Sequence, residues 1–187
     1  MTQRRITLPL SDEVIATLKA GDVVYLSGEM LTGRDAAHAR LFAALQHGEP
    51  LPIDLRGQTI YYVGPAPAQP GQVVGSAGPT SSYRMDPFTP ALLDRGLKGI
   101  IGKGDRSPAV IDALKRNHAV YFTAIGGLGA LIAESIVASE VIAYADLGTE
   151  AIHRFTVKDF PVIVTIDAAG NNLYTTQQAL YRKDSHE

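Results

Sequence analysis

Residues 99–124, GIIGKGDRSPAVIDALKRNHAVYFTA, contain the pattern that decides the fold class. The apolar run Gly99–Gly102 is typical of a short buried strand, and a second such run follows at Ala119–Ala124. Between them, Ser107-Pro108 combines a capping hydroxyl with a proline in the first turn, which predicts a helix over Ala109–Arg116. A strand, a helix and a strand in this order indicate an α/β protein.

The alternation continues on both sides of this stretch. Further strands are predicted at Val23–Leu26, Thr59–Val63, Glu140–Tyr144, Phe155–Val157, Pro161–Ile166 and, after a turn at Asn171-Asn172, at Leu173–Thr175. Further helices are predicted at Arg34–Gln46, at the residues that follow the capping pair Thr89-Pro90, and at Gly126–Ser139. We therefore expect residues 1–187 to form a single α/β domain with a mixed sheet.

Composition excludes several classes of protein. The formal net charge of −2 argues against a nucleic-acid-binding surface. No apolar run approaches the roughly 20 residues that a transmembrane helix needs, so we expect no membrane partner. The N-terminal stretch MTQRRITLPLSDE lacks the apolar segment of a signal peptide, and we expect a cytoplasmic protein.

The chain contains no cysteine. It therefore cannot form a disulfide, use a thiol nucleophile, or supply thiolates to zinc or to an iron–sulfur cluster. Its five histidines show no metal-binding spacing. If the function requires a metal centre, another chain must hold it.

Two glycine motifs resemble phosphate-binding sequences without matching them. Gly102-Lys103-Gly104 is not a Walker A motif, because Leu97 stands where its first glycine belongs and Gly104 where Ser or Thr belongs. It remains either a surface turn or a site where a lysine charge meets an anion. Gly126-Gly127-Leu128-Gly129 lacks the third glycine of a dinucleotide fingerprint, because position 132 is Ile.

Two other segments contain candidate functional side chains. Gly78–Asp86 (GPTSSYRMD) places three hydroxyls and an arginine in a constrained loop, which is either an ordinary turn or an anion pocket with proton-transfer groups. Arg34 begins a predicted helix, where a cation is locally unfavourable, and His38 follows on the same helix face. Taken alone, each of these residues is also compatible with an ordinary surface or core role.

These motifs belong to an ordered series along the chain. Its members are Arg34-Asp35-Ala36-Ala37-His38, Tyr61-Tyr62-Val63-Gly64-Pro65, Gly78-Pro79-Thr80, Arg84-Met85-Asp86, Gly102-Lys103-Gly104, Gly126-Gly127, Glu150-Ala151-Ile152, Val157-Lys158-Asp159-Phe160-Pro161 and Gly170-Asn171. Over about residues 5–175 the series resembles the C-terminal half of class I, iron–sulfur fumarate hydratases, which in some organisms is a separate β subunit. L(+)-tartrate dehydratase β subunits share the same framework.

The resemblance implies a swivelling β/β/α-type domain and reversible hydration of fumarate to (S)-malate. It implies a partner α subunit that holds a 4Fe–4S cluster on three cysteines, with the fourth iron free to bind substrate, and an assembly such as α2β2. This chain would bind no cofactor by itself. The absence of cysteine fits that division of labour.

The resemblance also assigns roles to individual residues. Arg34, Arg84 and Lys103 fall on the substrate-binding cations, and Thr80 on the threonine proposed as catalytic base. Ser81 stands where a second threonine is frequent and keeps the hydroxyl, so we expect it to contact substrate. Tyr83, where a small residue is frequent, departs from the pattern.

Forked arginines and a lysine suit a dianionic dicarboxylate, and they can offset the charge that builds on one carboxylate as a C–H bond breaks. Three alternatives stay open: an L(+)-tartrate dehydratase or related dicarboxylate hydro-lyase subunit, a stand-alone α/β enzyme or nucleotide binder, and a non-catalytic module that binds small anions. The incomplete phosphate motifs count against the nucleotide binder. The intact Arg34, Thr80, Arg84 and Lys103 count against the non-catalytic module.

Overall fold

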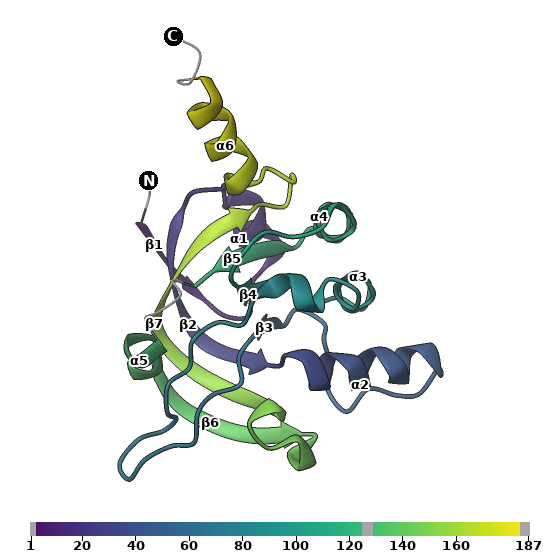
Figure 1. Cartoon of the computed structure of the whole chain (residues 1–187), viewed down its shortest axis with the longest axis vertical. Coiled ribbons are helices and arrows are strands. Elements are labelled where there is room, and N and C mark those ends of the chain that lie inside the picture. The colour runs from purple at the N-terminus through teal and green to yellow at the C-terminus, as the bar shows by residue number, and fades with distance from the viewer. Residues whose placement is uncertain (1–2, 125–128, 184–187) are drawn as a thin grey trace.

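The computed structural model describes residues 3–124 and 129–183. Seven strands form one sheet in the order β1-β2-β3-β4-β5-β7-β6, and a further pairing of β2 with β7 closes five of them into a barrel (Figure 1). Strands β1 to β5 pair in parallel, whereas β7 runs antiparallel to β2, β5 and β6. The strands are β1 (Gln3–Thr7), β2 (Val23–Thr32), β3 (Thr59–Tyr61), β4 (Gly99–Gly102), β5 (Val120–Thr123), β6 (Ile136–Ala143) and β7 (Ile152–Ile166).

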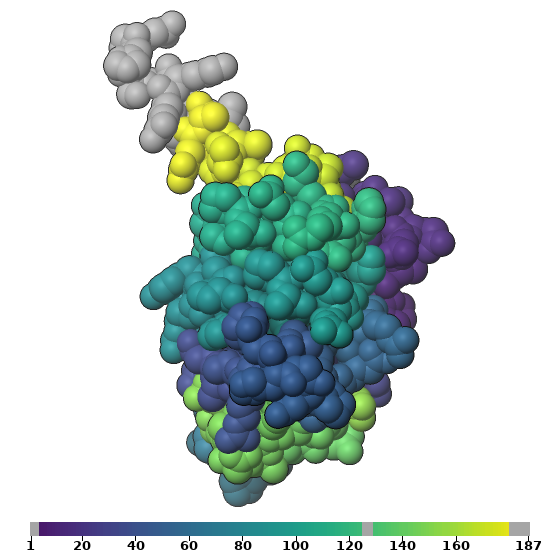
Figure 2. Space-filling model, turned by 90° about the vertical axis from the view of Figure 1, so that its right-hand side faces the viewer, coloured from purple at the N-terminus to yellow at the C-terminus, as the bar shows by residue number. Residues whose placement is uncertain are grey.

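Helices connect the parallel strands and cover one side of the barrel. In Figure 2, α2, α3 and α4 lie one beside the next on a single face, and the 3-10 helix η2 adjoins α2. The helical elements are α1 (Asp12–Thr17), α2 (Asp35–Gln46), η1 (Ser82–Met85), α3 (Thr89–Leu93), α4 (Pro108–Arg116), α5 (Gly129–Glu134), η2 (Ala145–Glu150) and α6 (Leu173–Lys183). Within the described residues, none of the helices is long and apolar enough to cross a membrane.

The central strands β4 and β5 are buried on both faces. Successive side chains point to opposite sides of a strand, so each strand contributes to two different clusters. Ile101 and Phe122 pack into the cluster that fills the barrel. Their chain neighbours Ile100 and Tyr121 pack outward, into a second cluster beneath the helices. This double burial explains why β4 and β5 read as continuous apolar runs in the sequence.

The mixed α/β architecture expected from the sequence is confirmed. The strand predicted at Gly99–Gly102 and the helix between β4 and β5 lie where they were expected. The cap at Ser107 is also confirmed, since its hydroxyl accepts the Val110 N–H.

Several expected elements were wrong at the C-terminal end. The helix predicted over Gly126–Ser139 ends at Glu134, and Ile136–Ala143 is a strand because β7 offers it a pairing edge. The segment Leu173–Thr175 begins helix α6, where Asn172 caps the first turn by accepting the Tyr174 N–H at 3.0 Å.

Three other differences concern the bounds of elements or elements that the sequence did not predict. The two strands predicted at Phe155–Val157 and Pro161–Ile166 are one continuous strand, β7, in which Asp159 has a φ of 49°. Thr89 is the first residue of α3 and not its cap, and its hydroxyl donates to the Met85 carbonyl. Strand β1 and helix α1 were not expected from the sequence at all.

Candidate functional site

The sequence-predicted site residues gather where parallel strands end. Arg34 follows the end of β2, and Lys103 directly follows β4. Strands β2, β3 and β4 run parallel and neighbour one another, so their carboxyl ends lie at the same edge of the sheet. This is the edge where open α/β sheets bind ligands.

The segment Thr80–Ser82 is held between the ends of β3 and β4. The Thr80 N–H donates to the Tyr62 carbonyl at 2.7 Å, and the Ser82 N–H donates to the Lys103 carbonyl at 2.9 Å. Ser81 forms an isolated parallel bridge with Lys103, and Thr80 is buried. The backbone of both sequence-predicted hydroxyl residues is therefore fixed by strand-like hydrogen bonds to the core.

Glycine at position 102 allows this close approach. A Cβ atom there would collide with the Ser82 hydroxyl, which also accepts the Lys103 N–H at 3.1 Å. Gly104, on the other side of Lys103, has a φ of +84°, a conformation that glycine adopts without strain. The glycines on both sides of Lys103 thus let its backbone approach η1 closely, in a bridge to Ser81.

Arg34 is fixed by a carboxylate and by a glycine. Its Nε donates to Oε1 of Glu150 at 3.0 Å, and the two side chains are 33% and 27% exposed. A Cβ atom on Gly64 would lie 2.9 Å from the Arg34 Nε, so only glycine leaves room for the guanidinium there. Arg34 is the N-cap residue of α2, but its side chain does not cap the helix. The side chain pairs with Glu150 instead.

Arg84 is linked to the same helix start. Its Nε donates to Oδ1 of Asp35 at 2.9 Å, and its Nη2 lies 2.8 Å from Oδ2. Asp35 is the chain neighbour of Arg34, so this pair brings the two arginines to one place although they are far apart in the sequence. Lys103 has an exposed side chain and forms no ion pair within the described residues.

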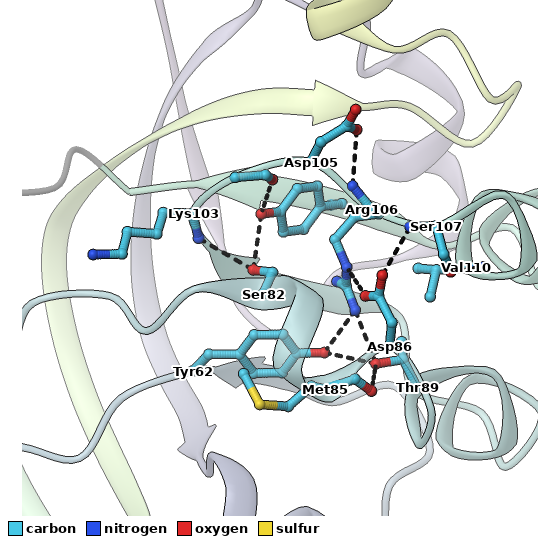
Figure 3. A network of polar contacts seen from close by, with 12 residues as sticks. Tyr62, Ser82, Met85, Asp86, Thr89, Lys103, Asp105, Arg106, Ser107 and Val110 are labelled. Carbon is cyan, nitrogen blue, oxygen red and sulfur yellow. Dashed lines mark hydrogen bonds and ion pairs between the residues drawn. The ribbon is translucent and has the colours of Figure 1, made fainter.

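A buried polar network, which sequence reasoning missed, lies next to Lys103 and Ser82 (Figure 3). Its centre is Arg106, whose side chain is fully buried and whose Nε donates to Oδ1 of Asp86 at 2.7 Å. The Nη2 of Arg106 donates to Thr89 Oγ1 at 2.9 Å and to the Tyr62 hydroxyl at 3.3 Å. The second carboxylate oxygen of Asp86 accepts the Ser107 N–H at 2.8 Å.

Aromatic rings enclose the Arg106 guanidinium. Its Cζ lies 5.4 Å from the ring centre of Tyr62 and 5.0 Å from that of Tyr121. Burial alone would lower the pKa of Arg106, but Tyr62, Asp86 and Tyr121 outweigh it, and the pKa is raised. Arg106 is therefore a permanent buried charge that joins η1, α3 and the start of α4.

Tyr121 connects this network to the hydroxyl segment. Its hydroxyl donates to the Gly104 carbonyl oxygen at 2.7 Å and lies 2.9 Å from Ser82 Oγ. Burial raises the pKa of Tyr121, so its hydroxyl stays protonated. No spacing rule links Tyr62, Asp86, Arg106 and Tyr121, because they come from four separate segments.

His38, in the first turn of α2, packs in the core. It is fully buried, its Nδ1 lies 2.9 Å from the Arg34 carbonyl oxygen, and its ring meets that of Tyr62 edge-on at 5.0 Å. Since a carbonyl only accepts, the Nδ1 must be protonated. Desolvation by burial lowers the pKa of His38 to about 4, which keeps the ring neutral near pH 7.

Two other features were noted in the sequence, Tyr83 and Gly126-Gly127. Tyr83 is 69% exposed beside Arg84, and Gly126-Gly127 lies outside the described residues. Across residues 3–124 and 129–183, no three His, Asp or Glu side chains are grouped as metal ligands, and the sequence has no cysteine. These 187 residues therefore supply no cysteine thiolate to an iron–sulfur cluster.

Comparison with known proteins assigns the family. The profile described as "Fumarase C-terminus" matches residues 1–177. Fumarate hydratase class I, aerobic, of Escherichia coli (strain K12) is 39% identical over 167 residues, which cover 87% of this chain and 30% of the relative. Fumarate hydratase 2 of Leishmania major is 38% identical over 157 residues, covering 83% of this chain and 28% of the relative.

A third relative has nearly the same length as this chain. The L(+)-tartrate dehydratase subunit beta of Escherichia coli (strain K12) is 33% identical over 181 residues, covering 94% of this chain and 89% of that subunit. By contrast, the chain spans less than a third of the two fumarate hydratases. The matched length and identity show that this chain belongs to the fumarase C-terminal family, which class I fumarate hydratases share with the β subunit of L(+)-tartrate dehydratase.

Proposed function

We propose that this chain is the β subunit of a two-subunit class I fumarate hydratase and takes part in the reversible hydration of fumarate to (S)-malate. The observation that carries the proposal is the position of Arg34, Arg84 and Lys103 at the sheet edge where the parallel strands end, the same edge at which the backbone of the buried Thr80 is held. Three cations at one edge of a protein with a net charge of −2 are suited to a dianion. Similarity to class I fumarate hydratases supports fumarate as the substrate.

A second candidate function is dehydration of L(+)-tartrate. It is favoured by the relative that this chain matches over 89% of its length, a separate β subunit of L(+)-tartrate dehydratase. Both substrates are small dicarboxylates, and the same cations would bind them. Turnover of fumarate and of L(+)-tartrate by the same preparation separates the two candidates.

In the proposed reaction this chain binds and orients the substrate. The guanidiniums of Arg34 and Arg84 hold carboxylates through their free N–H groups, and Lys103 adds a third positive charge. Thr80 lies beside them with its backbone tied to Tyr62, so its hydroxyl is in place to exchange a proton with the substrate carbon. The cations stabilise the charge that develops on the neighbouring carboxylate as that proton leaves.

The proposal includes a cluster-bearing α subunit and an assembly such as α2β2. The 4Fe–4S cluster would reside on that partner, because this chain has no cysteine. Exposed apolar side chains offer a surface for docking: Val73 is 44%, Leu131 59% and Val137 50% exposed. Val73 also lines a cavity of about 310 Å³, together with residues that include Ala133 and Ile136. Exposed apolar patches of this kind mark protein–protein contacts.

The purified chain alone is expected to fold and to have no hydratase activity. Activity should appear when it is combined with the chain that supplies the cluster. The ultraviolet absorbance of the fumarate double bond follows turnover in both preparations. Fumarate turnover by the purified chain alone would contradict the division into two subunits, and an inactive reconstituted pair with intact cluster would favour the non-catalytic anion-binding alternative.

Arg84→Lys in the assembled enzyme is expected to lower kcat/KM by about one to two decades. Arg84 uses one edge of its guanidinium for Asp35 and keeps further N–H groups for substrate, whereas an ammonium cannot present two separate edges. Loss of one charge-assisted hydrogen bond is worth roughly 1.5–3 kcal/mol. Steady-state kinetics with fumarate provides the measurement.

Arg116→Lys is a matched control. Arg116 makes the same kind of forked contact to Asp94, with its Nε at 3.0 Å from Oδ1, but the pair is exposed and remote from Arg34 and Thr80 in the fold. Its kinetics should match the wild type. Kinetics of Arg84→Lys within about twofold of the wild type would remove Arg84 from the substrate site.

A further inference from the structure

We infer that Glu150 is a positioning residue that orients Arg34 toward the substrate. The inference rests on the proposed function and adds a residue to it. Glu150 belongs to the series Glu150-Ala151-Ile152, to which the sequence assigned no role. It is the last residue of η2 and lies 116 positions after Arg34 in the chain.

The contacts of Glu150 hold the arginine at one edge only. Its Oε1 accepts from the Arg34 Nε at 3.0 Å and lies 3.5 Å from the Ala36 N–H in the first turn of α2. A guanidinium has five N–H groups, so four of them, on Nη1 and Nη2, stay free of Glu150. A bidentate contact to a substrate carboxylate requires two of these four.

Gly64 completes the restraint on the Arg34 side chain. The guanidinium lies so close to Gly64 that a Cβ there would be 2.9 Å from Nε and 3.0 Å from Cζ. Arg34 is thus confined between the backbone after β3 and the carboxylate of Glu150. A long side chain that is already ordered loses less conformational entropy when it binds substrate, which favours affinity.

Glu150 also lowers the local excess of positive charge. Arg34, Arg84 and Lys103 contribute three positive charges, and their partners Asp35 and Glu150 contribute two negative ones, leaving a net charge of +1. The two roles of Glu150, orienting Arg34 and compensating its charge, predict different KM values for a neutral residue at position 150. If only orientation matters, glutamine should leave KM nearly unchanged, whereas if charge compensation matters, glutamine should lower KM. Glutamine keeps an oxygen that accepts from Arg34 Nε but removes the negative charge, whereas alanine removes both.

The fold supplies a matched control between the same two elements. Asp146, also in η2, pairs with Arg40 of α2 through Nη1 at 2.8 Å, and the two side chains are 63% and 43% exposed. Asp146→Ala therefore removes an η2–α2 ion pair without touching Arg34. If Glu150→Ala weakened substrate binding only because η2 is held less firmly against α2, then Asp146→Ala would weaken it as well.

The test compares kcat and KM for fumarate in the assembled enzyme. For Glu150→Ala we expect KM to rise about tenfold with kcat within about threefold of the wild type, because binding is weakened and the chemical groups remain. Glu150→Gln should stay within about threefold of the wild type in both parameters, and Asp146→Ala should match the wild type. An unchanged KM in Glu150→Ala, or a KM in Glu150→Gln below that of the wild type, would overturn the inference.

A second measurement does not depend on activity. In the full chain without its partner, 15N relaxation of the Arg34 Nε–H should report an ordered group in the wild type and in Glu150→Gln. In Glu150→Ala the order parameter should fall toward the values below about 0.6 that mark flexible groups. An equally ordered Arg34 in Glu150→Ala would also refute the positioning role, whereas inactive wild-type enzyme with the expected relaxation changes would refute only the proposed function.

Discussion

Asp86→Ala is expected to lower the free energy of unfolding by about 3 kcal/mol, because it leaves the buried Arg106 guanidinium without its counter-ion. The side chain of Arg106 is fully buried and that of Asp86 is 14% exposed, so little water can replace the lost carboxylate. The substitution also removes the acceptor of the Ser107 N–H at the start of α4. Urea unfolding of the purified chain, followed by circular dichroism, measures the loss.

Two further variants identify the cause. Asp94→Ala removes a carboxylate from an exposed pair with Arg116 and should cost less than about 1 kcal/mol. The double variant Asp86→Ala/Arg106→Met should be more stable than Asp86→Ala alone, because methionine leaves no uncompensated charge in the core. If the double variant were the less stable of the two, the cost would arise from lost packing and not from the unpaired Arg106.

Thr80→Val in the assembled enzyme is expected to lower kcat by roughly 10², the usual contribution of a positioned proton-transfer group. KM should change little, because Arg34, Arg84 and Lys103 still bind the dianion. The backbone of Thr80 should not move, since its N–H continues to donate to the Tyr62 carbonyl. Valine has nearly the same shape as threonine, so the substitution removes the hydroxyl and little else.

Controls separate a chemical role from a structural one. Thr80→Ser keeps the hydroxyl and should retain most of the activity. Thr59→Val removes another buried threonine hydroxyl, at the opposite end of β3, and should leave kcat unchanged. Near-normal kcat in Thr80→Val would refute the base assignment and direct attention to Ser81, because Asp86 is already engaged by Arg106.

The local sequence pattern was sufficient to predict the strand and helix at the centre of this fold, β4 and α4. Gly99–Gly102 is apolar on both faces and was correctly predicted as a strand, because a doubly buried parallel strand leaves a continuous apolar run. The Ser107-Pro108 start was equally clear, since capping depends on residues that are adjacent in the chain. The residues around β7 were less predictable: Ile136–Ala143 has enough apolar residues for either a helix or a strand, and only pairing with β7 decides between them.

The sequence by itself determined the α/β class, the absence of any cysteine thiolate that these residues could give to a cluster, and the identity of Arg34, Thr80, Ser81, Arg84 and Lys103 as candidates. Only the tertiary structure decided what stands beside them. Asp35 meets Arg84 across 49 positions and Glu150 meets Arg34 across 116, because the ends of the parallel strands β2 to β4 and the start of the antiparallel strand β7 lie at one edge of the sheet. The Asp86–Arg106 pair behind them has no sequence signature, since a buried ion pair is defined by exclusion from water, and that depends on the whole packed chain.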